Sequence, residues 1–173
     1  HPSAHAGEVA TALSRGAFEF QGQKCSAASR AYIPESLWPD VKAQLVADVQ
    51  SFKMGEPEDF GNFINAVIDE KAFDKISSYI DYAANATDAE IIVGGKYDKS
   101  EGYFIDPTVI VTTNPQFKSM VEEIFGPVLT IYVYKDEDWS ETLKLVDSTS
   151  EYALTGAIFS QDRYAAEEAT LAL

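Results

Sequence analysis

The sequence contains few of the residues from which metal centres and disulfide-stabilised domains are built: one cysteine and two histidines among 173 residues. Cys25 has no second cysteine to pair with, which fits a reducing compartment. His1 and His5 stand at the beginning of the sequence, where Pro2 and the lack of a third ligand argue against a metal site. We therefore expect two solvated histidines and no metal centre.

Basic residues are scarce as well. The sequence has 13 Lys and Arg against 28 Asp and Glu, a formal net charge of −15. This balance argues against nucleic acid and against an anionic membrane surface, because both require a basic face. No apolar run approaches the roughly 20 residues that span a bilayer, and the opening residues lack the pattern of a secretory signal. With 46% hydrophobic residues, the sequence instead predicts a folded domain with a substantial core.

Both ends of the sequence interrupt a pattern. The sequence opens on His1-Pro2-Ser3 and stops within the helix-like run 165–173 without a stop signal. We therefore expect residues 1–173 to be one domain of a longer protein.

Apolar periodicity predicts alternating helices and strands. We expect helices at residues 7–20, 37–52, 70–83 and 139–146 and after Asp162, with Asp69 and Asp162 as the capping residues of the third and the last helix. We expect strands at residues 31–33, 90–93, 103–113, 128–134 and 157–160. Strands separated by helices indicate crossover connections, and so an α/β fold with a mostly parallel sheet and helices on both faces. The nearly continuous apolar run 128–134 predicts the central strand of that sheet.

The segment "FEFQGQKCSAASRAYIP" (residues 18–34) surrounds the single cysteine. Gly22 permits a close backbone approach, and Lys24 adds a positive charge that favours a thiolate. A nucleophilic cysteine also needs a base and an oxyanion site, and neither a histidine nor a prominent acid lies near Cys25 in the sequence. The residues alone leave two interpretations: an inert core thiol, or a nucleophile whose base lies outside this chain.

The segment "EEIFGPVLTIYVY" (residues 122–134) also allows two interpretations. Its two acids could simply solvate the turn at Gly126-Pro127, with Phe125 in the core. Alternatively, a carboxylate at the entrance of a strand can accept hydrogen bonds from the two hydroxyls of a ribose, and the phenylalanine can pack against a planar ring.

Taken together, these two segments, about a hundred residues apart, resemble the aldehyde dehydrogenase superfamily. The resemblance covers the whole chain in order. The further segments "DFGNFINAVID", "GGKYDKSEGYFIDPT" and "DSTSEYALTGAIFSQD" are similar to the Δ1-pyrroline-5-carboxylate (L-glutamate γ-semialdehyde) dehydrogenases of proline catabolism.

The resemblance implies NAD-dependent oxidation of L-glutamate γ-semialdehyde to glutamate through a cysteine thiohemiacetal and a thioester. It makes Cys25 the nucleophile, whose backbone N–H helps to hold the oxyanion. It also implies that Ser26 binds the carboxylate end of the substrate, that Glu123 holds the nicotinamide ribose and that Phe125 lies beside the nicotinamide.

Several parts of the family pattern are missing from this sequence. The general-base glutamate, the oxyanion asparagine, the dinucleotide-binding domain and the downstream loop of the carboxylate pocket have no counterpart among the 173 residues. We therefore expect residues 1–173 to be a catalytic domain, truncated at both ends, that is inactive and binds NAD poorly by itself. The resemblance implies a homo-oligomeric parent protein, located in the mitochondrial matrix of a eukaryote or the cytoplasm of a bacterium.

Three alternatives remain open on the sequence. The first is a cysteine hydrolase or acyltransferase that uses Cys25, and the second is a non-catalytic assembly module. The third is an aldehyde dehydrogenase that oxidises another aldehyde, because only the detailed segments and Ser26 favour the semialdehyde.

Overall fold

The computed structural model describes all of residues 1–173. Its four-stranded sheet has the order β1 (Arg30–Pro34), β6 (Val128–Tyr134), β5 (Thr108–Thr112) and β2 (Ala89–Val93). The first three strands are parallel, and β2 pairs antiparallel to β5 at one edge. The predicted α/β class with a mostly parallel sheet is therefore confirmed, and the run predicted to be central is β6, which has a partner on each side.

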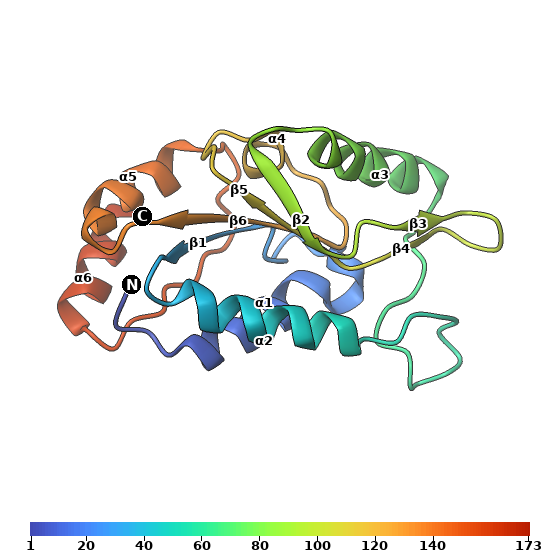
Figure 1. The fold of residues 1–173 in the computed structure, drawn as a ribbon, viewed down its shortest axis with the longest axis horizontal. Coiled ribbons are helices and arrows are strands. Elements are labelled where there is room, and N and C mark those ends of the chain that lie inside the picture. The colour runs from blue at the N-terminus through green and yellow to red at the C-terminus, as the bar shows by residue number, and fades with distance from the viewer.

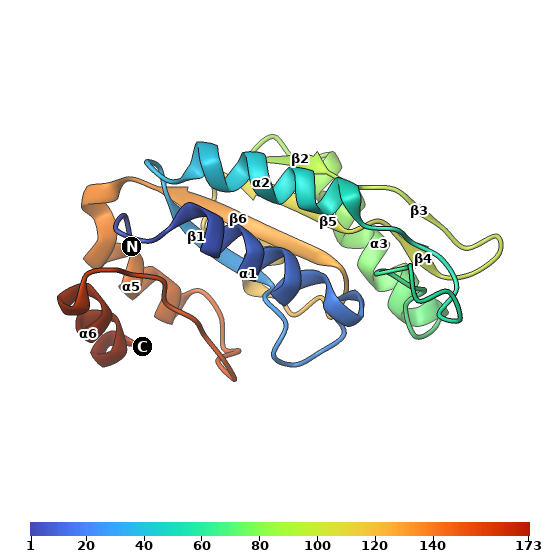
Figure 2. The same cartoon turned by 90° about the horizontal axis from the view of Figure 1, so that it is seen from below.

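Helices cover both faces of the sheet (Figures 1 and 2). On one face lie α1 (Ala6–Phe18) and α2 (Trp38–Ser51), and on the other lie α3 (Glu70–Ala84) and the short α4 (Lys118–Val121). Since both faces of the sheet are covered, its strands carry apolar side chains in both directions, which explains the continuous apolar run from which β6 was predicted.

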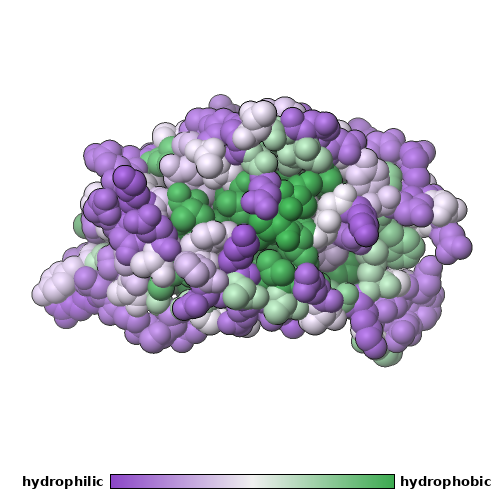
Figure 3. All heavy atoms as spheres, viewed as in Figure 1, coloured by the Kyte–Doolittle hydropathy of each residue, from purple (hydrophilic) through white to green (hydrophobic).

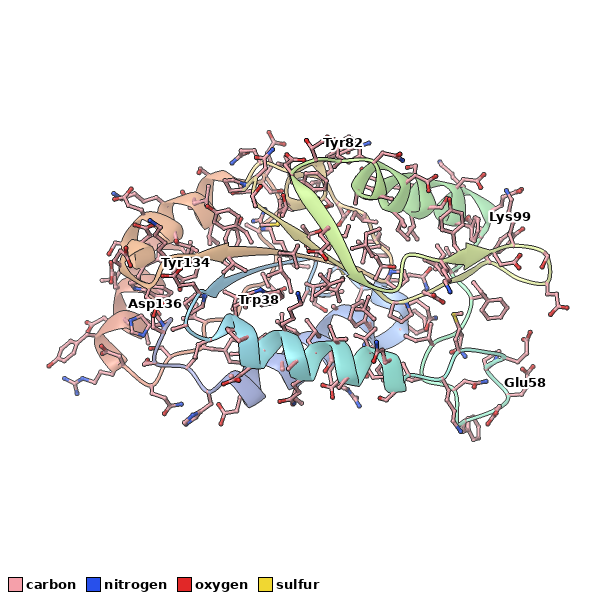
Figure 4. All side chains as sticks on the ribbon, in the orientation of Figure 1. Trp38, Glu58, Tyr82, Lys99, Tyr134 and Asp136 are labelled. Atoms are coloured by element: carbon pink, nitrogen blue, oxygen red, sulfur yellow. The ribbon has the colours of Figure 1, made fainter.

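The remaining elements lie at the two ends of the sheet. Helices α5 (Trp139–Ser148) and α6 (Arg163–Ala172) stand at one end, close to both termini (Figure 1). The two-stranded hairpin of β3 (Tyr97–Asp98) and β4 (Phe104–Ile105) extends at the other end. Lys99 of this hairpin reaches the first turns of α3 (Figure 4) and pairs with two acids there, Glu70 and Asp74.

Alternate side chains of the central strand divide the core into two clusters. Leu129 and Ile131 pack with α1 and α2, whereas Val128 packs with α3. The buried hydroxyl of Thr130 is hydrogen-bonded to Ser119 of α4 at 2.7 Å, so this polar group meets a partner in the core. The pleat of one strand thus holds the helical layers on both faces in fixed positions.

Two side chains predicted to begin helices do so. Asp69 accepts a hydrogen bond from the Ala72 N–H at the start of α3, and Asp162 accepts one from the Tyr164 N–H at the start of α6. Each carboxylate satisfies a backbone donor that has no partner within the helix.

The predicted strand at residues 157–160 is wrong. These residues have no regular secondary structure, and Ala157 and Ile158 are exposed. A strand forms only where a neighbouring strand supplies hydrogen bonds, and here the Phe159 carbonyl instead accepts from the amino group of His1 at 3.0 Å. Residues 157–160 have the local β-propensity of a strand, but no neighbouring strand pairs with them.

None of the helices combines the length and the apolar character that a membrane span requires. On the face seen in Figure 3, apolar atoms gather in the middle, where β2 lies nearest the viewer in Figure 1. Strand β2 carries the half-buried Ile91, Ile92 and Val93. This edge of the sheet is opposite β1, the edge that borders the site described next.

Candidate active site

The loop that carries the cysteine begins with three consecutive residues in the left-handed region. Phe20, Gln21 and Gly22 have φ values of 53°, 55° and 64° and terminate α1 two residues earlier than predicted. Such a conformation is unfavourable for residues with a side chain, so surrounding contacts must hold it. At Gly22 a side chain is excluded outright, because a Cβ atom there would lie 2.2 Å from the Gly126 carbonyl oxygen.

Cys25 and Ser26 are the two central residues of a tight turn. The Ala27 N–H donates to the Lys24 carbonyl at 3.0 Å and closes the turn, while the Ala28 N–H donates to the Gly16 carbonyl of α1 at 2.9 Å. Both side chains are exposed, and neither backbone N–H donates to another protein group. The thiol is therefore displayed at the surface with two free donors beside it, and the inert core thiol is ruled out.

Lys24 does not act on Cys25 alone. Its ammonium is 3.1 Å from the carboxylate of Glu19, and the guanidinium of Arg15 lies 3.5 Å from the same carboxylate. The hydrogen bond from Lys24 lowers the pKa of Glu19. The positive charge next to Cys25 in the sequence is therefore paired with an acid.

Two glutamines hold the cysteine loop against the segment that leads to α3. The Gln21 side-chain oxygen accepts from the Asn65 N–H at 3.1 Å, and the Gln23 side-chain oxygen accepts from the Ile68 N–H at 2.8 Å. Gln21 is buried, so its side-chain oxygen takes the place of water as the acceptor for a backbone N–H in the interior. Sequence reasoning missed both residues, although their position on either side of Gly22 was visible.

The second predicted segment forms an irregular loop between α4 and β6. Phe125 has a φ of 65° and is 41% exposed as a residue, while the preceding Ile124 is buried in the core. Glu122 and Glu123 are both exposed. The Glu122 carboxylate accepts a hydrogen bond from Tyr79 of α3, whereas the Glu123 carboxylate accepts none from the protein.

The carbonyl groups at the entrance of this loop are bound by side chains from elsewhere. Arg30, at the start of β1, donates to the Met120 carbonyl at 3.1 Å, and Ser150 donates to the Val121 carbonyl at 2.8 Å. Arg30 follows the cysteine by five residues, so it connects the two predicted segments directly. Apart from a basic residue at the start of a strand, no pattern in the sequence indicates this role.

One groove of about 1020 Å³ is lined by all four predicted site residues, Cys25, Ser26, Glu123 and Phe125. Its other walls include β1, parts of α1, α5 and α6, the end of α4 and residues 150–159. The two segments that lie about a hundred residues apart in the sequence are therefore brought to one cavity. A thiol, free backbone donors, an unpaired carboxylate and a half-exposed aromatic ring meet there, which suits a covalent reaction beside a bound planar group.

Comparison with known proteins is consistent with this arrangement. Residues 1–173 match the aldehyde dehydrogenase family over their whole length. This chain belongs to the aldehyde dehydrogenase family. The mitochondrial Δ1-pyrroline-5-carboxylate dehydrogenase of Dictyostelium discoideum is 63% identical over 90% of the chain, and the human enzyme of that name is 49% identical over 100%.

A solved structure has the same fold as this aldehyde dehydrogenase domain. The Δ1-pyrroline-5-carboxylate dehydrogenase of Mycobacterium tuberculosis bound with NAD superimposes with a TM-score of 0.92, at 42% identity over 99% of the chain. The chain spans only 28% of the Dictyostelium protein, 31% of the human protein and 31% of the mycobacterial one.

Proposed function

We propose that this chain is the cysteine-bearing catalytic domain of a longer NAD-dependent dehydrogenase that oxidises L-glutamate γ-semialdehyde to glutamate. The observation that carries the proposal is the common groove of Cys25 and Glu123, in a chain whose relatives are named Δ1-pyrroline-5-carboxylate dehydrogenases. The Dictyostelium and human relatives are both named as mitochondrial, which supports a mitochondrial location if the source is a eukaryote.

Cys25 is the nucleophile of the proposed reaction. Its sulfur, as the thiolate, adds to the aldehyde carbon and forms a C–S bond, while the carbonyl oxygen takes the negative charge of a thiohemiacetal anion. The free Cys25 N–H is placed to hydrogen-bond that oxygen, an interaction worth about 3 kcal/mol in related oxyanion sites. Loss of hydride from this carbon gives a thioester on Cys25, and hydrolysis of the thioester releases the acid and restores the thiol.

NAD fits the residues that line the groove. The Glu123 carboxylate has unused acceptor sites for the two ribose hydroxyls, and the exposed ring of Phe125 offers an apolar surface to a planar group. Bound NAD supplies the hydride acceptor. The contribution of this chain is to hold the ribose through Glu123 and to keep the acceptor beside Cys25.

Ser26 is the proposed contact for the far carboxylate of the substrate. It shares the turn of Cys25, its side chain is exposed, and its hydroxyl makes no hydrogen bond within the protein. A hydroxyl donor adjacent to the nucleophile distinguishes a substrate with a second polar end from a simple aliphatic aldehyde.

The isolated chain should not turn over. A general base for Cys25 is needed to activate the thiol and the hydrolytic water, and no acid or histidine hydrogen-bonds to Cys25. The test is NADH formation from glutamate γ-semialdehyde by the whole protein, by its Cys25→Ala variant and by residues 1–173 alone. Only the first should form NADH. Activity of the Cys25→Ala protein would remove Cys25 from the mechanism, and activity of the isolated chain would show that it holds its own base.

A further inference from the structure

One side of α3 faces the loop that carries Glu123 and Phe125. The Lys75 ammonium donates to the Glu123 backbone carbonyl at 2.7 Å, and the Tyr79 hydroxyl donates to the carboxylate of Glu122. Lys75 and Tyr79 are four residues apart and so lie one above the other on the same helical face. Neither side chain has a place in the chemistry described above.

The two neighbouring carboxylates therefore differ in what they can still bind. Both Glu122 and Glu123 line the groove. Tyr79 occupies an oxygen of Glu122, whereas both oxygens of Glu123 are free of protein donors. A carboxylate that gives one oxygen to each of the two ribose hydroxyls does so without a competing donor only when neither oxygen is engaged by the protein. The Tyr79 hydroxyl thus distinguishes the two acids.

The backbone between these acids and the strand is also fixed on α3. Ile124 and Ile76 are buried in the same cluster, and a Cβ atom on Gly126 would lie 2.4 Å from the Ile76 side chain. The Lys118 ammonium lies 4.5 Å from the centre of the Tyr79 ring, a cation–π contact that holds the ring in place. The loop is consequently fixed by side-chain contacts in place of regular secondary structure.

We infer that Lys75 and Tyr79 are positioning residues for the carboxylate of Glu123, which we call the cofactor clamp. Lys75 fixes the backbone at Glu123 and Tyr79 engages Glu122, so that Glu123 is the carboxylate presented to the ribose. The inference rests on the proposed role of Glu123 in NAD binding.

The test uses the whole protein with Tyr79→Phe and Lys75→Met. The matched controls are Tyr82→Phe and Lys71→Met, because both side chains lie on α3, are exposed and make no hydrogen bond in the structure (Tyr82 is labelled in Figure 4). The Kd for NAD is measured by calorimetric titration. Each test variant should bind NAD about tenfold more weakly, the effect of one lost hydrogen bond to a charged or strongly polar group, and the controls should stay within twofold.

Two further measurements separate positioning from a general loss of structure. Amide hydrogen exchange in residues 121–127, without NAD, should be faster in Tyr79→Phe and Lys75→Met than in the controls. The kcat at saturating NAD and the alkylation rate of Cys25 by iodoacetamide should stay within twofold of the parent. Lys75→Arg keeps a donor and should recover most of the affinity that Lys75→Met loses.

A Glu123→Ala variant distinguishes the two ways in which the inference can fail. If Glu123→Ala weakens NAD binding while Tyr79→Phe and Lys75→Met both bind NAD normally, the positioning role is wrong. The role of Glu123 as the cofactor clamp is then supported. If Glu123→Ala leaves NAD binding unchanged, the clamp itself is wrong, and the positioning role falls with it.

Discussion

Gly22 and Gly126 approach each other backbone to backbone: a Cβ atom on Gly22 would stand 2.2 Å from the Gly126 carbonyl oxygen. One glycine precedes Cys25 by three residues, and the other follows Glu123 by three. The loop of Cys25 therefore touches the loop of Glu123 at a point where position 22 cannot carry a side chain.

Gly22→Ala should separate the two loops. The new methyl group would meet a backbone oxygen, and alanine would also have to hold the φ of 64°. We expect the free energy of unfolding to fall by about 3 kcal/mol. Urea unfolding measures the change. Gly156→Ala is the control, because a Cβ atom there meets nothing within 4 Å, and a drop of equal size in the control would refute the contact as the cause.

Gln21→Ala should destabilise the chain more than a surface glutamine does. It leaves the Asn65 N–H without its acceptor next to a buried side chain. The expected loss is about 1–3 kcal/mol in the free energy of unfolding. Gln50→Ala, on the exposed side of α2 with no hydrogen bond, should change it by less than about 0.5 kcal/mol. Equal effects would mean that the amide of Gln21 does not hold the loop.

Stability should fall at alkaline pH through buried tyrosines. Burial, reinforced by the hydrogen bond to Glu122, raises the pKa of Tyr79 to about 12, and burial also raises the pKa of Tyr32 and of Tyr134. The unfolded chain loses these protons from about pH 10, whereas the folded chain keeps them. This stabilisation is complete below pH 10 and is lost as the pH rises toward 12.

Urea unfolding at several pH values from 8 to 11.5 measures the slope. Tyr79→Phe should make the decline shallower, because one phenol that binds its proton more tightly in the folded state is removed. Tyr164→Phe, an exposed phenol, is the control for the substitution itself. An unchanged slope in Tyr79→Phe would contradict the role assigned to its burial.

Ser26→Ala tests the substrate end of the groove. In the whole protein the variant should raise the KM for glutamate γ-semialdehyde about tenfold, because a hydroxyl donor to a carboxylate is lost. The KM for an aliphatic aldehyde of the same chain length should stay within twofold. Steady-state kinetics on the two substrates measure the split, and equal increases would assign Ser26 to the turn instead of the substrate.

The sequence predicted the elements whose signal is contained in their own residues. Strand β6 is buried on both faces and is therefore almost continuously apolar. Asp69 and Asp162 cap helices with side chains that reach only two or three residues away. Residues 157–160 have similar local preferences, but a strand also needs a partner, which local sequence cannot report.

The site was predicted only in part, for a related reason. Cys25 and Glu123 stand in motifs, whereas the residues that hold them in place act across long separations in the sequence. Gln21 bonds to a residue 44 positions away, Lys75 to one 48 positions away, and Arg30 to one 90 positions away. Such contacts depend on the folded arrangement, and no pattern of residue types reveals them in advance.

The chemical state of Cys25 during turnover decides whether the proposed covalent reaction takes place. The whole protein is mixed with glutamate γ-semialdehyde and NAD, quenched in acid within one turnover, digested and analysed by mass spectrometry. We expect a glutamyl thioester on the peptide that contains Cys25, which is absent when NAD is omitted and absent in Cys25→Ala. Turnover with an unmodified Cys25, or an acyl group found on another residue, would contradict it.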